Sequence, residues 1–265
     1  MNRSDMAAMA ATPTAAFISL LLPSTGVDSQ GYADRGPHRL STLELAQSLY
    51  EGLLPLAEQF KVVIAGGDVN CWNHPLAINV ALLGTPGPNG PLRRTEAQHG
   101  DWIMVTGELG GSILGRHFTF TPRVVEAQQL RRDYTLHAGM DISDGLALDL
   151  WRLCSASGVG AVINAAAVPI SAAAYELAGR SSNKMALEHA LSDGEDFELL
   201  FTLPAAEGKR LLAEQPLTGV AVAHIGQVVA EAGLWLETPQ GERQPLEPKG
   251  FQHGTEFQQG KKPSD

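Results

Sequence analysis

The chain has 265 residues, a formal net charge of −10 and 44% hydrophobic residues. This composition is typical of a globular protein with material for one large domain or two medium ones. The acidic balance disfavours polyanionic partners, so we expect neither nucleic acid nor an anionic membrane to bind. A nucleotide remains compatible, because Mg²⁺ can bridge carboxylates and phosphates.

Cys71 and Cys154 are the two cysteines, and neither lies at the spacing of a zinc site. Such sparse use of cysteine fits a reducing cytosol. The apolar run at residues 15–23 is about half of the ~20 residues that a membrane span needs. The first 13 residues lack the basic start and the long apolar region of a signal peptide. We therefore expect a cytoplasmic protein.

Helices and apolar strands alternate over the first 92 residues. A helix end is predicted at 5–11, and an amphipathic helix at 42–60, with a kink or irregular turn at Pro55. Residues 26–41 are predicted to be a loop. Runs of strand length predict buried strands at residues 16–22 and 61–68, the second ending in a glycine turn, and another strand at 76–84.

A turn-rich connector at residues 85–91 separates this part from a second one with the same alternation. Strands are predicted there at 101–107, 159–165, 197–204, 219–229 and 234–238. Helices are predicted at 143–156, at 205–215, after the glycine-rich turn at 107–111, and from Pro169 onward. The pattern predicts a mixed α/β (α+β) fold of two domains, residues 1–92 and 93–265.

Two acidic positions in the first part have both a functional and an ordinary explanation. Asp5 could bind a ligand, but Ser4 or Asp5 could simply cap a helix. Asp68 follows two glycines at the predicted end of a strand. Ligands bind at that edge of α/β sheets, and glycine lets the backbone approach a phosphate closely. A tight turn would equally require the glycines.

The stretch "GMDISDGLALDLW" at 139–151 places two acids and a serine where a strand turns into a helix. Ser143 could be the N-cap, and Asp144 could complement the helix dipole. Capping does not explain Asp141. A helix N-terminus also suits phosphate oxygens, and carboxylates beside it would hold Mg²⁺.

Two further spots leave alternatives open. The stretch at 192–201 crowds four acids into one turn, which either binds a ligand or is simply solvated. These acids are Asp193, Glu195, Asp196 and Glu198. Arg93 and Arg94 either clamp an anion or form a solvated surface pair.

In chain order, "SDMAAM", "GGD", "RR", "GDWIMVTGELG", "DISDGL", "GEDFELLF" and "KGF" resemble the thiamine-monophosphate kinase family. That family belongs to the aminoimidazole ribonucleotide synthetase-like superfamily. The resemblance runs from Asn2 to about Phe251. It implies two α/β domains, with the first incomplete at its start and paired across a homodimer into a shared β-barrel. It also implies ATP-dependent phosphorylation of thiamine phosphate to thiamine diphosphate.

The resemblance further implies roles for individual residues. The expected ligands of several Mg²⁺ ions are Asp5, Asp68, Asp141 and Asp144. The positions expected to bind ATP are Glu51, Gly67, Asp68, Arg94 and Ser143. Glu195 and Phe251 match positions that hold thiamine phosphate. No general base is expected, because the acceptor is already a phosphate oxygen and catalysis would rest on positioning and charge neutralisation.

Three features depart from the family pattern. A front segment with further metal-binding acids is absent, Val69 and Asn70 replace two hydroxyl residues, and Ala10 replaces a glycine. A misassigned start, a fragment and a degenerate paralogue all remain open. A protein that truly begins at Met1 is expected to have weak or no kinase activity.

The alternatives to a thiamine-phosphate kinase come from two classes. One is another ATP-using enzyme of the superfamily, such as a selenophosphate synthetase or a hydrogenase-maturation protein. The tail "GKKPSD" lacks the C-terminal cysteine of the latter. The other is a non-catalytic nucleotide- or thiamine-binding protein.

Overall fold

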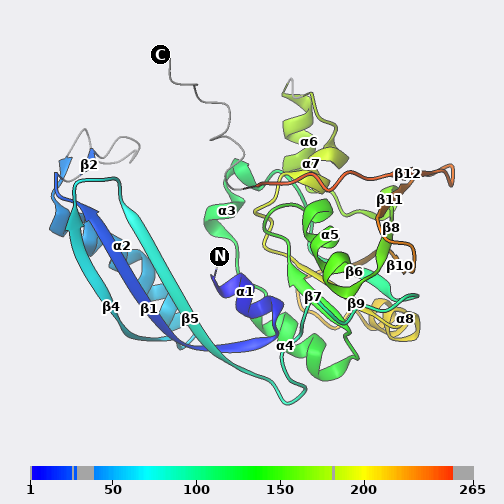
Figure 1. The fold of residues 1–265 in the computed structure, drawn as a ribbon, viewed down its shortest axis with the longest axis horizontal. Coiled ribbons are helices and arrows are strands. Elements are labelled where there is room, and N and C mark those ends of the chain that lie inside the picture. The colour runs from blue at the N-terminus through cyan, green and yellow to red at the C-terminus, as the bar shows by residue number, and fades with distance from the viewer. Residues whose placement is uncertain (1, 26, 29–38, 181–182, 253–265) are drawn as a thin grey trace, which may run out of the picture. The chain divides into compact units, whose positions relative to one another are not determined.

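The computed structural model describes residues 2–25, 27–28, 39–180 and 183–252. The chain divides into two compact units (Figure 1). The smaller unit contains Asn2 and Thr12–Thr85, and the larger unit contains Arg3–Ala11 and the chain from Pro86 onward. The domain boundary predicted after residue 92 lies a few residues later than the division between Thr85 and Pro86, and it stays a prediction.

The smaller unit is a three-stranded sheet with a helix packed on one face. Its strands are β1 Ala11–Pro23, β4 Val63–Trp72 and β5 Ala77–Pro86, in the order β4-β1-β5, and its helix is α2 Thr42–Gln59. Ile18, Leu20 and Leu22 alternate along β1 and pack against α2. Ser41 and Glu44 form a capping box that begins the helix. Pro55 lies within α2, so it does not end the helix.

Most of the loop predicted at 26–41 lies outside the described residues. Within it, β2 Val27–Asp28 and β3 Arg39–Leu40 form a short antiparallel pair. The predicted strand at 61–68 does not end in a glycine turn. Instead β4 continues through Gly66 and Gly67 to Trp72, paired in parallel with β1.

The larger unit is built on a seven-stranded sheet. Its strands are β6 Trp102–Thr106, β7 Ala138–Asp141, β8 Gly160–Asn164, β9 Leu199–Leu203, β10 Val222–Val229, β11 Leu234–Glu237 and β12 Arg243–Pro245. Their order is β12-β11-β8-β10-β6-β9-β7. The described pairings are antiparallel except that of β11 with β8.

Helices connect these strands and cover them. Their bounds are α3 Arg116–Thr119, α4 Val124–Asp133, α5 Leu146–Ser157, α6 Ala172–Gly179, α7 Ala186–Ser192 and α8 Ala205–Glu214. The predicted apolar stripe of α5 is confirmed, because Leu146, Leu150 and Leu153 are fully buried in the main core. The interleaved strands and helices confirm the mixed α/β class. Among the described residues, no helix is both long and apolar enough to cross a bilayer.

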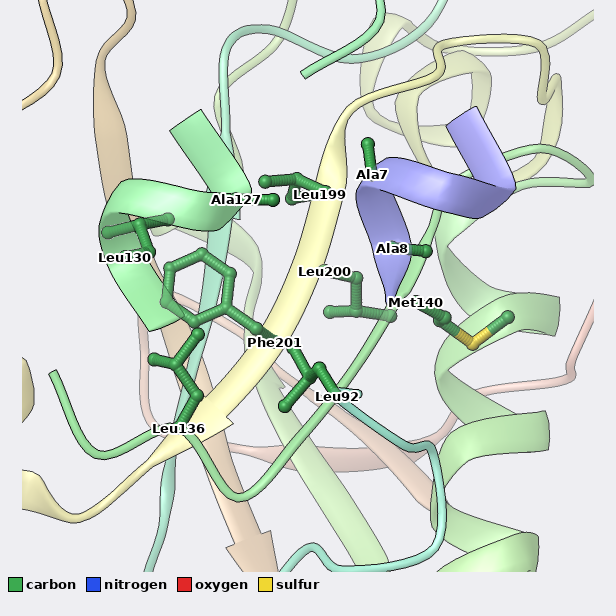
Figure 2. Close-up of a pocket in the computed structure, with 10 residues that line it drawn as sticks. All are labelled: Ala7, Ala8, Leu92, Ala127, Leu130, Leu136, Met140, Leu199, Leu200 and Phe201. Carbon is green, nitrogen blue, oxygen red and sulfur yellow. The ribbon is translucent and has the colours of Figure 1, made fainter. Parts of the chain in front are cut away.

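The first helix, α1 Asn2–Ala8, packs against the larger unit through its last turn. Figure 2 shows Ala7 and Ala8 beside Leu199 and Leu200 of β9. The void between them measures about 10 Å³ and is lined by apolar side chains, so it is packing space rather than a ligand site. This contact fixes the position of Ser4 and Asp5 in the larger unit.

Candidate functional site

The turn between β7 and α5, residues 142–145, is the meeting point of three motifs. The backbone N–H of Glu195 donates to the carbonyl of Ser143 at 2.7 Å, and that of Phe251 donates to the carbonyl of Asp144 at 2.8 Å. The "DISDGL", "GEDFELLF" and "KGF" segments therefore lie side by side in the larger unit. Of the residues predicted from the sequence, this turn brings together Asp141, Ser143, Asp144, Glu195 and Phe251.

The backbone that carries Glu195 is strained. Glu195 and Phe197 have φ angles of 55° and 51°, in the left-handed region that costs a non-glycine residue about 1–3 kcal/mol. Gly194, with φ 76°, precedes them, and a Cβ there would lie 2.6 Å from the carbonyl oxygen of Ser143. Hydrogen bonds to the 142–145 turn hold this conformation, which is typical of a functional site.

Asp149 organises the turn from inside α5. Its Oδ2 atom accepts the N–H groups of Ser143, Asp144 and Gly145 at 3.0, 2.9 and 3.2 Å, and its side chain is fully buried. The predicted N-cap at Ser143 is wrong, because α5 begins after Gly145 and has no side-chain cap bond there. These three amides bind a carboxylate of the protein, so they are not an open cradle for phosphate.

Asp144 has a cationic partner within the protein. The Nη1 atom of Arg152 donates to Asp144 Oδ2 and also to Asp149 Oδ1, the latter at 2.8 Å. The side chains of Arg152 and Asp144 are 32% and 22% exposed, whereas Asp149 is fully buried. The arginine is thus anchored on a buried acid and contacts a more accessible one.

Asp141 ends β7 as a buried carboxylate, 6% exposed. Ser4 of α1 donates a hydrogen bond to its Oδ2 atom. Burial raises the pKa of Asp141 to about 6, and the nearby charges of Asp5 and Asp149 also raise it. Burial likewise raises the pKa of Asp5. A cation between Asp5 and Asp141 would relieve this unfavourable concentration of negative charge.

The predicted four-aspartate metal cage is not assembled within one unit, because Asp68 belongs to the smaller one. Among the described residues, no three His, Cys, Asp or Glu side chains are arranged to hold a metal. Asp5 and Asp141 nevertheless offer only carboxylate oxygens. Mg²⁺ commonly takes one or two carboxylates and completes its shell with water and substrate phosphates. The donor chemistry therefore fits Mg²⁺.

The predicted residues of the smaller unit lie on exposed surfaces. Asp68 sits in the middle of β4 rather than at its end, and its Oδ2 accepts from Asn70 Nδ2 at 2.6 Å. Gly67 has a structural reason of its own, because a Cβ would collide with the carbonyl of Ile18 on β1. Glu51 is exposed on α2.

The two arginines of the connector are exposed in the larger unit. Arg93 pairs loosely with Glu96 at 3.9 Å, and the backbone carbonyl of Arg94 accepts a hydrogen bond from Ser157 at 2.8 Å. Arg94 is an exposed residue, and its predicted contact with a nucleotide stays a prediction.

Sequence reasoning missed the structural role of two acids in "GEDFELLF". Asp196 and Glu198 are each 1% exposed, so the solvated alternative is wrong for them. Asp196 Oδ1 accepts from the Gly110 N–H at 2.9 Å and the Ser112 hydroxyl at 2.8 Å. Glu198 accepts from Thr106. The two acids thus hold both ends of the glycine-rich segment 107–112. The signal available in the sequence was the alternation of Asp196 and Glu198 with apolar residues at the entry to β9.

Replacing Asp196 with Asn should stabilise the protein at high pH. Burial raises the pKa of Asp196 to about 7, and its Oδ2 has no hydrogen-bond partner among the described residues. Its folded pKa exceeds the unfolded value, so wild-type stability falls as pH rises from about 4 to 7. Asn keeps the acceptor but cannot ionise. The stability gain of Asp196→Asn should therefore grow by about 2 kcal/mol between pH 5 and pH 8 in urea unfolding. A gain independent of pH would contradict this explanation.

Comparison with known proteins agrees with the position of these motifs. Residues 1–85 match the family model of the AIR synthase related protein N-terminal domain, and residues 104–237 match that of its C-terminal domain. A thiamine-monophosphate kinase of Rhodopirellula baltica is 41% identical over 254 residues, which cover 96% of this chain and 74% of that protein.

Solved structures give the same result. A structure described as AaThiL complexed with AMPPCP and TMP matches with a TM-score of 0.74 and 28% identity, over 95% of this chain and 77% of that one. The thiamine-monophosphate kinase of Stenotrophomonas maltophilia matches with a TM-score of 0.72 and 30% identity, over 92% and 77%. The resemblance and the fold predicted from the motifs are confirmed, and the chain belongs to the thiamine-monophosphate kinase family.

Proposed function

We propose that this chain transfers the γ-phosphoryl group of ATP to thiamine phosphate, giving thiamine diphosphate and ADP, with bound Mg²⁺. The observation that carries this proposal is the meeting of three family motifs on the 142–145 turn. The relatives support it, because the 41%-identical protein is a thiamine-monophosphate kinase. A related structure binds an ATP analogue together with TMP.

Within the larger unit, each proposed role follows from position and charge. Asp5 and Asp141 would hold Mg²⁺ together, and Asp144 would contribute the oxygen that Arg152 does not contact. Bound Mg²⁺ would supply charge neutralisation between donor and acceptor phosphates. Glu195 and Phe251, anchored on the same turn, would position thiamine phosphate, and Ser143 would contact ATP.

In the smaller unit, Asp68 would ligate metal beside Gly67, and Glu51 would lie near the nucleotide. Arg94, exposed on the larger unit, would reach a phosphate. The acceptor oxygen is already anionic, so the protein needs no general base. Its own contribution is to orient the two phosphates and to exclude competing arrangements. We also propose that the enzyme works in the cytoplasm, in keeping with its two unpaired cysteines.

The decisive experiment incubates the purified chain with ATP, Mg²⁺ and thiamine phosphate and separates the thiamine products chromatographically. Formation of thiamine diphosphate and ADP in equal amounts is the expected result. Thiamine in place of thiamine phosphate is the acceptor control. Calorimetric binding of ATP and thiamine phosphate without any product would instead support the non-catalytic alternative.

We further propose that the smaller unit pairs with a second copy of itself. On the sheet face opposite α2, Phe17, Val63 and Leu83 are 42%, 64% and 54% exposed. Phe17 points away from α2, because side chains alternate along β1 and its neighbour Ile18 faces α2. Val63 lies on the same face as Phe17, because it pairs with Ala15, two residues before Phe17 on β1. Exposed apolar faces of this kind mark association surfaces.

Light scattering of the wild-type chain should therefore give the mass of a dimer. The double variant Val63→Lys, Leu83→Lys should be monomeric, because two like charges would face their copies across the interface. Leu43→Lys is the matched control, since Leu43 is 68% exposed on α2. A monomeric wild-type protein at micromolar concentration would contradict the proposal.

A further inference from the structure

Arg152 occupies a particular electrostatic position beside the proposed metal site. Its Nη1 atom donates to both Asp144 and Asp149, from the second turn of α5. The side chain of Asp149 is fixed in place, because its Oδ2 atom accepts hydrogen bonds from three consecutive backbone N–H groups. The guanidinium is therefore tethered next to Asp144 by a buried acid.

Unlike the buried Asp149, Asp144 is accessible to a second cation besides Arg152. Its side chain is 22% exposed, and one carboxylate oxygen accepts from Arg152. The other oxygen can approach an incoming ion. A divalent cation on that oxygen would lie within a few ångströms of the fixed guanidinium, and like charges at such a separation repel appreciably at a partly buried site.

We infer that Arg152 is a positioning residue that serves as the resident counter-ion of Asp144 and lowers the divalent-metal affinity of the 142–145 turn. It orients the carboxylate through one oxygen and opposes metal binding at the other. Removing its charge therefore tightens metal binding, although it also removes a hydrogen bond. This inference rests on the proposed function, since it concerns the same acidic turn.

The test measures binding of Mn²⁺, a spectroscopic substitute for Mg²⁺, by electron paramagnetic resonance. Wild type, Arg152→Gln and Arg152→Lys are compared with and without a non-hydrolysable ATP analogue. Arg152→Gln should bind Mn²⁺ about 3- to 10-fold more tightly. Arg152→Lys keeps the charge and should stay within about twofold of wild type. A purely structural role would give equal or weaker binding in both variants.

Two controls assign the effect to its source. Arg180→Gln removes an arginine that pairs with Glu176 on the surface of α6, and it should leave Mn²⁺ affinity unchanged. The double variant Asp144→Asn, Arg152→Gln should lose the gain, because the arginine acts through Asp144. Thermal unfolding of each variant verifies that it is folded under the binding conditions.

Unchanged or weakened Mn²⁺ binding by Arg152→Gln overturns the inference, as does a lack of detectable Mn²⁺ binding by every protein in both conditions. The kinase assay decides the proposed function separately. Tighter binding by Arg152→Gln in a chain without kinase activity would keep the inference and remove the function. If the wild-type chain is an active kinase and Arg152→Gln binds Mn²⁺ with wild-type affinity, the proposed function stands and the inference about Arg152 is wrong.

Discussion

Replacing Asp141 with Asn is expected to lower kcat by about 10²- to 10³-fold while leaving the fold at least as stable. Asn has nearly the same shape and can still accept the hydrogen bond from Ser4. It lacks the charge that would hold a divalent cation. The loss should appear in steady-state kinetics at saturating ATP and thiamine phosphate, and extra Mg²⁺ should restore little of it.

The stability half of this prediction follows from the titration of Asp141. Burial raises its pKa to about 6, above the value in the unfolded chain. The folded protein therefore loses stability as pH rises from about 4 to 6, because the carboxylate must then ionise in a buried place. Asp141→Asn avoids this loss and should be about 1–2 kcal/mol more stable than wild type at pH 8 in EDTA.

A buried acid outside the site is the matched control. Asp101 is 3% exposed and accepts from the Gln98 N–H at 2.9 Å, and His137 lies 2.9 Å from it. Asp101→Asn should keep its activity and lose about 1 kcal/mol of stability. Opposite effects of the two substitutions would separate a functional acid from a structural one. An Asp141→Asn enzyme with wild-type kcat would remove Asp141 from the metal site.

Periodicity predicted the elements whose side chains alternate or repeat clearly. The stripe of α5 and the apolar strands of the larger sheet are of this kind. It missed α4, which buries Val124, Ala127 and Leu130 within a very polar segment, and α7, which is only seven residues long. It also mistook Gly66 and Gly67 for a turn, because a glycine required by close pairing of β4 with β1 has the same signature.

The candidate site was predictable only where a motif marks it. The order of motifs identified Asp141, Glu195 and Phe251, and the structure places all three at one turn. Asp149 escaped notice because its role depends on burial and on hydrogen bonds directed back to residues 143–145. The structural role of Glu198 was missed for a similar reason, since the sequence alone does not distinguish a solvated acid from one that is buried between two arginines.

Glu198→Ala is expected to destabilise the larger unit by about 3–5 kcal/mol. The buried carboxylate accepts two hydrogen bonds from Arg123, from Nε at 2.8 Å and from Nη2 at 2.7 Å. It also accepts hydrogen bonds from the guanidinium of Arg116 and from the hydroxyl of Thr106. Alanine would leave two arginines without their shared anion and Thr106 without its acceptor. The arginines are 31% and 20% exposed, so water can recover only part of the loss.

Guanidinium unfolding followed by tryptophan fluorescence measures this loss, because Trp102, Trp151 and Trp235 all belong to the larger unit. Glu176→Ala is the control, since it removes a glutamate whose ion pair with Arg180 is more than half exposed on both sides, and it should cost about 0.5 kcal/mol or less. If Glu198→Ala cost no more than this control, the buried carboxylate would not be what holds α3 and the start of α4 to β9. The glycine-rich segment 107–112 would then owe its conformation to Asp196 alone, and Asp196→Ala, which removes the acceptor for Gly110 and Ser112, would become the substitution that releases it.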